Sequence, residues 1–116
     1  MEPSYTIEEY VTYDGVSPFA DWLLRLKDKR LQAKIRARLA RASFGNFGDW
    51  KALKDAQGIY ELREHSGAGY RIFYAVIDGK IVLLLAGSSK KDQQKSIAKA
   101  KEYLSDYQTR RLNHDN

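Results

Sequence analysis

Two arginines in the middle of the chain have the types and spacing that could bind a phosphate. Residues Gly58 to Gly87 read as three consecutive antiparallel strands, and the pairing that keeps apolar residues on one side sets Arg63 opposite Arg71. Like charges directly across a ladder destabilise it, whereas guanidinium groups bind phosphate oxygens in pairs. This placement predicts a polyanion site on the face of the sheet away from the core. The alternative is a pair of solvated arginines neutralised by Glu61 and Glu64.

Three more ionisable residues are expected at the same end of the sheet. Lys90 and Lys91 follow the third strand and add positive charge that suits RNA or an acidic protein segment. His65 falls on the same face as Arg63, and imidazole is the commonest general base near neutral pH. A histidine beside a turn is more often simply exposed, so both interpretations of His65 stay open.

Two other groups of cations are candidates for RNA binding. Lys51 and Lys54 lie in the segment before the first of the three strands, within reach of the arginines. Arg30, Lys34 and Arg38 recur along one side of the second predicted helix and form a basic ridge. For both groups the alternative is an ordinary solvated surface.

The elements that must position these residues can be predicted in chain order. Residues 5–13 alternate in polarity as an edge strand does, up to the turn Asp14-Gly15. Ser17-Pro18 opens a helix whose buried stripe includes Trp22, which is expected to lie against the sheet. A second helix, residues 29–43, follows the interruption at Asp28 and ends before Gly45.

The three strands and a last helix complete the predicted domain. Asp78-Gly79 suits a two-residue type I′ turn that pairs Ile77 with Lys80, and this register carries Arg71 opposite Ala86. The last helix begins after Ser89 and buries one face, made of Ile97, Ala100, Leu104 and Tyr107. We therefore predict one α+β domain over residues 1–109, with a meander joined to the first strand in one sheet, and a flexible polar tail over residues 110–116.

Composition narrows the function classes. At 116 residues and 43% hydrophobic content the chain has room for one core. It has no cysteine, which excludes disulfides and thiolate metal sites, and its two histidines argue against a histidine-based metal site. No apolar run approaches the ~20 residues that span a bilayer, and no signal peptide is evident, so we expect a cytoplasmic protein. The net charge of +5 favours nucleic acid or an acidic protein as partner.

Several segments carry a resemblance to a known family. The element order resembles that of the RelE/ParE superfamily of toxins, and more narrowly that of its HigB-like branch of addiction module killer proteins. The same resemblance is carried by the segments SPFADWL, LKDKRLQAKIRARL, GNFGDWK, ELREHSGAGYRIFY, IVLLLAG and KAKEYLSDY. The match spans about Ser17 to Tyr107, and Gly69-Tyr70-Arg71 is its most characteristic piece.

The resemblance implies the toxin of a type II toxin–antitoxin module. Its partner would be a helix-turn-helix, HigA-like antitoxin that masks a basic surface of the toxin, and the complex would bind operator DNA through the antitoxin. RelE-type members are mRNA interferases that cleave messenger RNA in the ribosomal A site. ParE-type members share the fold and inhibit DNA gyrase, so the fold alone does not choose the target.

The resemblance also implies residue roles. RelE-type cleavage uses the ribose 2′-hydroxyl as nucleophile and leaves a 2′,3′-cyclic phosphate, so it requires neither a metal nor another cofactor. Arg71 matches the arginine that holds the scissile phosphate, and Arg63 matches a basic position on the preceding strand. Lys90 or Lys91 matches the basic position after the last strand.

Departures from the family pattern leave a second function open. Glu61 stands where RelE has another lysine, and Lys95-Ser96 occupy the region of its base-stacking tyrosine. Ser89 and Ser96 replace acids common in the HigB-like branch. The alternative is therefore a non-catalytic toxin, either a ParE-like gyrase inhibitor or a degenerate toxin acting only with its antitoxin.

Overall fold

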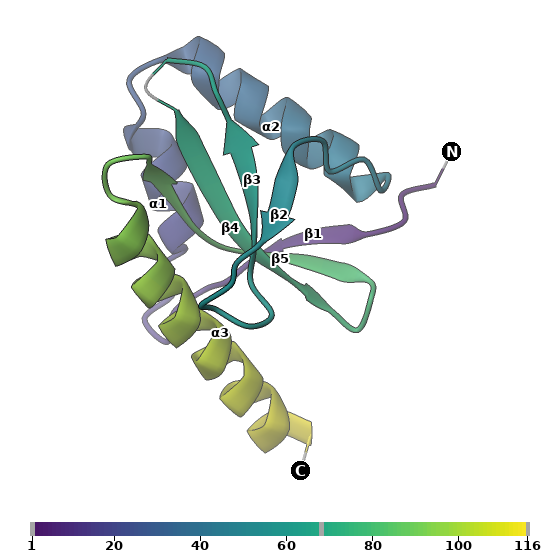
Figure 1. Ribbon diagram of the computed structural model, residues 1–116. Coiled ribbons are helices and arrows are strands. Elements are labelled where there is room, and N and C mark those ends of the chain that lie inside the picture. Colours follow the sequence, from purple (N-terminus) through teal and green to yellow (C-terminus); the bar gives the residue numbers. More distant parts are fainter. Residues whose placement is uncertain (1, 68, 116) are drawn as a thin grey trace.

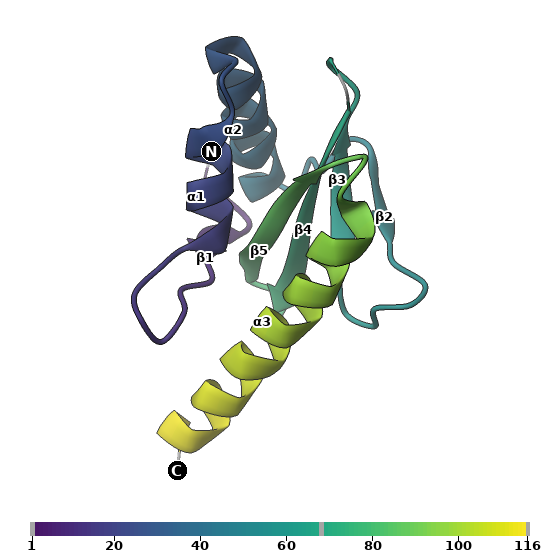
Figure 2. The same ribbon diagram turned by 90° about the vertical axis from the view of Figure 1, so that its left-hand side faces the viewer.

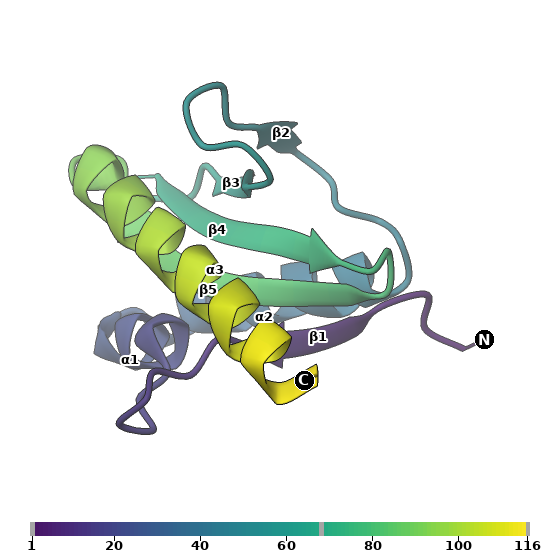
Figure 3. The ribbon, with the colours of Figure 1, turned by 90° about the horizontal axis from the view of Figure 1, so that it is seen from below.

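The chain forms one five-stranded mixed sheet with helices on both faces. The computed structural model describes residues 2–67 and 69–115, the last two of these by their backbone alone. In chain order the elements are β1 (Thr6–Glu9), α1 (Pro18–Arg25), α2 (Lys29–Ser43), β2 (Trp50–Ala52), β3 (Tyr60–Glu64), β4 (Tyr70–Ile77), β5 (Ile81–Ser89) and α3 (Gln93–Asp115). The strands lie in the order β1-β5-β4-β3-β2, with β1 parallel to β5 and the other pairs antiparallel (Figure 3). The predicted α+β fold with its meander, edge strand and C-terminal helix is confirmed, whereas β2 was not predicted.

Helices cover both faces of the sheet. Figures 1 and 2 show α1 and α2 on one face and α3 running diagonally across the other. The sheet therefore has a hydrophobic core on each face. On one face Phe19, Ile35 and Leu39 of α1 and α2 pack with Leu62, and on the other face Phe73 packs under α3. The arginine face was predicted to lie away from the core. That prediction is wrong for most of the face, because α3 buries it.

The β3–β4 register agrees with the prediction and the β4–β5 register does not. Arg63 lies opposite Arg71, as expected. In the second hairpin Ile77 pairs with Ile81 instead of Lys80, and a bulge after Phe73 shifts Arg71 opposite Ser88 instead of Ala86. The run from Ile81 to Ala86 is apolar at every position because both faces of β5 are buried. Alternation therefore carries no information on the register of this strand.

The predicted helix starts have the expected caps. Ser17 Oγ accepts a hydrogen bond from the Ala20 amide at 3.2 Å, with Pro18 in the first turn. Asp28, predicted only as an interruption, caps α2 by accepting from the Arg30 amide at 2.9 Å and from the Leu31 amide at 3.3 Å. Helices α1 and α2 therefore form a hairpin with a short, capped connection.

The last helix is longer than predicted. It was expected to give way to a polar tail at Arg110, but α3 continues to Asp115, and Figure 1 shows its last turns extending past the sheet. The guanidinium of Arg110 binds Asp106 at 2.7 Å and donates to the Val11 carbonyl at 2.5 Å. These contacts explain why helical structure persists into the polar segment. None of the described helices combines the length and apolarity that a bilayer-spanning helix requires.

Candidate functional site

Arg63 and Arg71 converge on a single carboxylate. Arg63 Nε lies 3.2 Å from Glu61 Oε1, and Arg71 Nε lies 3.7 Å from Glu61 Oε2. On the other side, β2 places Lys51 opposite Glu61, and Lys51 Nζ lies 3.8 Å from Oε1. Adjacent antiparallel strands bring these residues onto one face of the sheet, since directly paired and alternate positions share a face. The site is a cluster of cations around one acid.

Glu61 is the buried centre of this cluster. Its side chain is 1% exposed, and Gln93 at the start of α3 donates to Oε2 at 3.5 Å. The expected alternative, in which glutamates neutralise the arginines, is correct for Glu61. It is wrong for Glu64, which instead pairs with Arg38 at 3.7 Å.

The cluster keeps a positive surplus that reaches solvent. One carboxylate faces two guanidinium groups and an ammonium, so the acid offsets only part of the charge. The side chain of Lys51 is 53% exposed and that of Arg63 is 28% exposed, whereas that of Arg71 is 11% exposed. An incoming phosphate would therefore meet Lys51 and Arg63 first, with Arg71 behind them.

His65 has an acid partner that the sequence did not reveal. Its Nε2 lies 2.6 Å from Asp49 Oδ2, and the Asp49 carbonyl accepts the Arg63 amide at 3.0 Å. The hydrogen bond to His65 lowers the pKa of Asp49, with a further contribution from the Arg63 charge. Predicting this pair required knowing that the segment before β2 runs beside β3. The glycine-rich loop Gly45–Asp49 gave no such signal.

The two lysines after β5 lie where they were expected. The Lys90 amide donates to the Gly69 carbonyl at 3.1 Å, which continues the β4–β5 ladder by one residue. Lys90 and Lys91 are both exposed. Ser88, directly opposite Arg71, is buried, and its hydroxyl has no hydrogen-bond partner among the described residues. The basic end of the sheet thus extends from the arginines to these lysines.

The basic ridge predicted on α2 is interrupted at Arg38. Its guanidinium points inward, where it donates to the carbonyls of Arg63 at 2.5 Å, Phe47 at 3.1 Å and Asp49 at 3.2 Å. Lys34 Nζ donates to Ser66 Oγ at 2.9 Å, and Arg30 is exposed. The prediction that Arg38 faces an RNA partner is therefore corrected, because its donors hold the loop before β2.

Glu64 completes the contacts around Arg38. Burial acts to raise the pKa of Glu64, but hydrogen bonds from the side chain and backbone of Ser66, together with the charges of Arg38 and Lys34, hold that pKa below its ordinary value. Glu64 is thus an ionised anchor at the tip of the β3–β4 hairpin.

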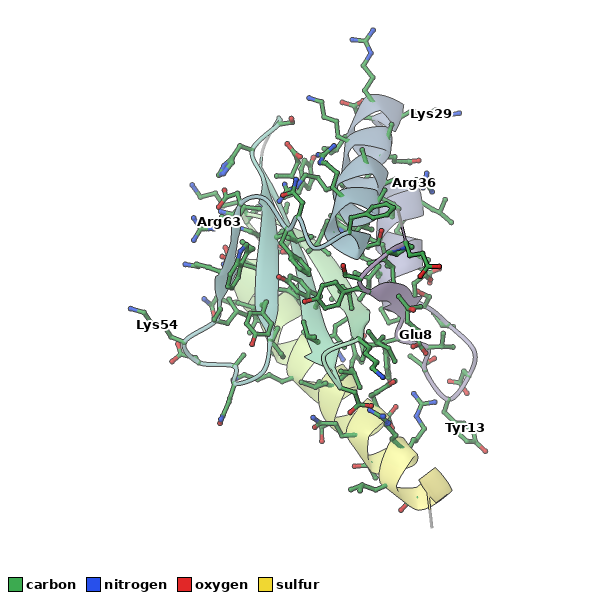
Figure 4. The ribbon with its side chains drawn as sticks, turned by 90° about the vertical axis from the view of Figure 1, so that its right-hand side faces the viewer. Glu8, Tyr13, Lys29, Arg36, Lys54 and Arg63 are labelled. Atoms are coloured by element: carbon green, nitrogen blue, oxygen red, sulfur yellow. The ribbon has the colours of Figure 1, made fainter. Side chains whose placement is uncertain are left out.

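Lys54 lies beside the cluster without joining it. It is exposed in the loop after β2, and Figure 4 shows Lys54 and Arg63 on the same side of the molecule, whereas Arg36 extends from α2. Lys51 and Lys54 line a hollow between this loop and the first turns of α3, whose floor includes Ile97. In the parts of the chain that the structure describes, no group of three acidic or imidazole side chains is placed to hold a metal ion.

Comparison with known proteins identifies the family. A family model described as phage-derived protein Gp49-like matches residues 21–105. An uncharacterized protein of Haemophilus influenzae is 48% identical over 83 residues, which cover 72% of this chain and 82% of that protein. The structure of an arginine double mutant of the E. coli toxin RelE in the free state superposes with a TM-score of 0.60 at 17% identity, covering 85% of this chain and 96% of RelE. The chain therefore belongs to the Gp49-like family and has the fold of the RelE-like toxins.

Proposed function

We propose that this protein is the toxin of a type II toxin–antitoxin module and acts as a ribosome-associated mRNA endoribonuclease. The observation that supports the proposal is the pairing of Arg63 with Arg71 on neighbouring strands of a RelE-like sheet. Two guanidinium groups at this spacing can hold one phosphate in the orientation that a displacement at phosphorus requires. The Gp49-like family match and the HigB-like sequence resemblance support the same function.

The proposed reaction is transesterification within RNA. The ribose 2′-hydroxyl supplies the nucleophile, so the reaction needs a base, stabilisation of the charged phosphate and a proton for the leaving oxygen. Arg71 and Arg63 are assigned to the phosphate, and Lys90 or Lys91 to the developing charge on the leaving side. No metal or other cofactor has a part in this scheme.

The remaining cations are assigned to the RNA strand on either side of the cut. Lys51 and Lys54 line the hollow next to the cluster, so they are proposed to contact phosphates of the adjoining nucleotides. Arg30 and Lys34, which lie on α2 near the tip of the β3–β4 hairpin, stay candidates for RNA contacts. Arg38 is left out because its guanidinium already donates to loop carbonyls. Each contact of this kind positions the strand without reading its bases.

The test is cleavage of translated messenger RNA by the purified protein. Translating ribosomes programmed with a defined message are incubated with the wild type and with Arg71→Ala, and cuts are mapped by primer extension. We expect cuts inside codons that leave 2′,3′-cyclic phosphate ends. Cleavage by the variant should be at least about a hundredfold slower. Equal cleavage by Arg71→Ala would contradict the assignment of the site.

The proposed partners follow from the same function. A helix-turn-helix, HigA-like antitoxin would cover the positive surface around Arg63 and Lys51 with acidic residues, in the cytoplasm. Through that antitoxin the complex would bind operator DNA. Co-expression with the neighbouring gene tests this, because a true antitoxin restores growth and co-purifies with the toxin.

Glu61 favours a second candidate, a non-catalytic toxin of the ParE type or one that acts only with its antitoxin. A buried carboxylate between the arginines competes with a phosphate for the same donors, and RelE has a lysine at the matching position. Inhibition of supercoiling by purified gyrase, with messenger RNA left intact, would support this candidate over the nuclease.

A further inference from the structure

We infer that Asp49 and His65 form an acid–base dyad, in which His65 takes the proton from the ribose 2′-hydroxyl and Asp49 positions the imidazole. This inference rests on the proposed nuclease function and names the base that the function needs. It stands on the 2.6 Å contact between His65 Nε2 and Asp49 Oδ2 at the end of β3 next to the arginine pair.

The backbone of Asp49 is held from two sides. Its carbonyl accepts hydrogen bonds from the Arg63 amide on β3, at 3.0 Å, and from Arg38 Nη2 on α2, at 3.2 Å. Gly48, with φ of +63°, allows this close approach, since a Cβ there would lie 3.2 Å from Arg38 Nη2. The carboxylate is therefore presented to His65 by a fixed backbone.

The loop that carries Asp49 is anchored by an aromatic contact as well. Phe47 stacks on Tyr74 of β4, with ring centroids 5.7 Å apart and planes within 8° of parallel. Together with the hydrogen bonds to Arg38, this contact ties the loop to both α2 and the sheet. The loop is therefore held in place by contacts other than the one between Asp49 and His65.

The geometry orients the imidazole. An ionised carboxylate only accepts hydrogen bonds, so Nε2 of His65 donates to Asp49 and Nδ1 is the nitrogen left to act as a base. Among the described residues, none is hydrogen-bonded to Nδ1, and the His65 side chain is 68% exposed. A substrate hydroxyl can therefore reach the basic nitrogen.

The charges around the pair fit this role. Asp49 is flanked by Arg63 on β3 and Arg38 on α2, so its carboxylate stays ionised while it accepts from His65. On the next strand Arg71 lies opposite Arg63, where it would hold the phosphate that His65 serves. A carboxylate that binds an imidazole stabilises the imidazolium that forms when the base accepts a proton.

The proposed step conserves atoms and charge. His65 Nδ1 takes the proton of the 2′-hydroxyl while the 2′-oxygen forms a bond to phosphorus. The bond between phosphorus and the 5′-oxygen breaks, and its electron pair stays on the 5′-oxygen, which takes a proton from solvent. The products are a 2′,3′-cyclic phosphate and a 5′-hydroxyl, and His65 then returns its proton to solvent.

The first test observes the dyad without RNA. In proton NMR of the isotope-labelled protein, a downfield Nε2–H signal of His65 is expected, because hydrogen bonding to a carboxylate shields this proton from exchange. The chain has two histidines, so its disappearance in His65→Gln assigns the signal. It should vanish in Asp49→Ala and remain in Asp14→Asn, a substitution in an exposed turn. Absence of the signal in the wild type would overturn the dyad.

The second test uses cleavage of ribosome-bound message. Loss of a general base costs about 10²–10⁴ in kcat, so His65→Ala is expected in this range, and Asp49→Ala should lose about tenfold to a hundredfold with KM unchanged. Because Asp49 acts through His65, the double variant should be no slower than His65→Ala alone. Additive losses, or full activity of His65→Ala, would overturn the dyad while the nuclease function stands. A wild type that cleaves no RNA would instead overturn the proposed function, and with it the chemical role of the dyad.

Discussion

Arg71 and Glu61 form an ion pair beneath the start of α3, with 3.7 Å between Arg71 Nε and Glu61 Oε2. This pair explains how β3 and β4 tolerate two arginines directly opposite one another. Without the shared carboxylate, like charges across the ladder would repel, and Arg71 would be a buried cation without a counter-ion. Glu61 thus stabilises the folded site and, by the same charge, weakens its attraction for a polyanion.

The first prediction concerns Glu61→Gln. Removing the carboxylate should lower the free energy of unfolding by about 2 kcal/mol, below the 3–5 kcal/mol of a fully buried pair because Arg63 and Lys51 reach solvent. The same change should raise affinity for single-stranded RNA. It should also steepen the salt dependence by about 0.7 in log–log slope, the value for one additional phosphate contact.

Thermal unfolding and fluorescence anisotropy at several salt concentrations measure the two effects. Asp14→Asn is the control, since Asp14 is exposed in the turn between β1 and α1 and does not line the hollow that holds Lys51 and Lys54, so it should change neither quantity appreciably. Unchanged RNA affinity in Glu61→Gln would mean that the acid does not compete with phosphate at this site.

The second prediction separates a structural arginine from an exposed one on the same helix. Arg38→Met removes the donors to the carbonyls of Phe47 and Asp49 and should cost about 2–4 kcal/mol, because several hydrogen bonds from one charged group are lost together. Arg36→Met, at an exposed position two residues earlier, should change stability by less than about 0.5 kcal/mol. Denaturant midpoints measure both. A stable Arg38→Met that had lost RNA binding would instead support the role predicted from the sequence.

Where local chemistry dominates, the sequence was sufficient to predict the fold. The cap at Ser17 and the end of α2 at Gly45 are set by residues within one turn, and the structure has both. The β3–β4 register was also predicted, because Leu62 and Ile72 face one side while Arg63 and Arg71 face the other. A sharp polar and apolar division leaves only one acceptable pairing.

Where partners come from distant segments, the sequence was insufficient. β2 has only three residues, all exposed, so it has no hydrophobic pattern, and the Asp49–His65 pair depends on it. Arg38 looks like its exposed neighbours on α2 in sequence, and only its hydrogen bonds to the loop carbonyls hold its side chain largely out of solvent. Charge patterns thus predicted where cations gather, but not which of them are already engaged.

The third prediction concerns the contact between α1 and β5. Trp22 lies so close to Gly87 that a Cβ at that position would be 2.1 Å from Trp22 Cε3. Gly87→Ala should therefore destabilise the fold by about 1–3 kcal/mol or more, through displacement of the indole. In a double-mutant cycle, Trp22→Leu should recover part of the loss, so that the two substitutions together cost less than their sum. Strict additivity in chemical denaturation would show that the indole does not restrict this position.

The fourth prediction is an acid-dependent loss of stability at the hairpin tip. The folded pKa of Glu64 lies below its ordinary value of 4.5, so the folded state holds the ionised form more strongly than the unfolded chain does. This contribution is present in full above about pH 4.5 and is lost as the pH falls through the folded pKa. The gap in melting temperature between the wild type and Glu64→Gln should therefore be largest near neutrality and close progressively in acid.

Ser66→Ala should show a smaller gap with the same pH dependence, since it removes the hydroxyl donor at 2.9 Å and keeps the amide donor. A gap that stays constant from neutral pH into acid would mean that packing of the side chain, not its charge, holds the tip of the hairpin.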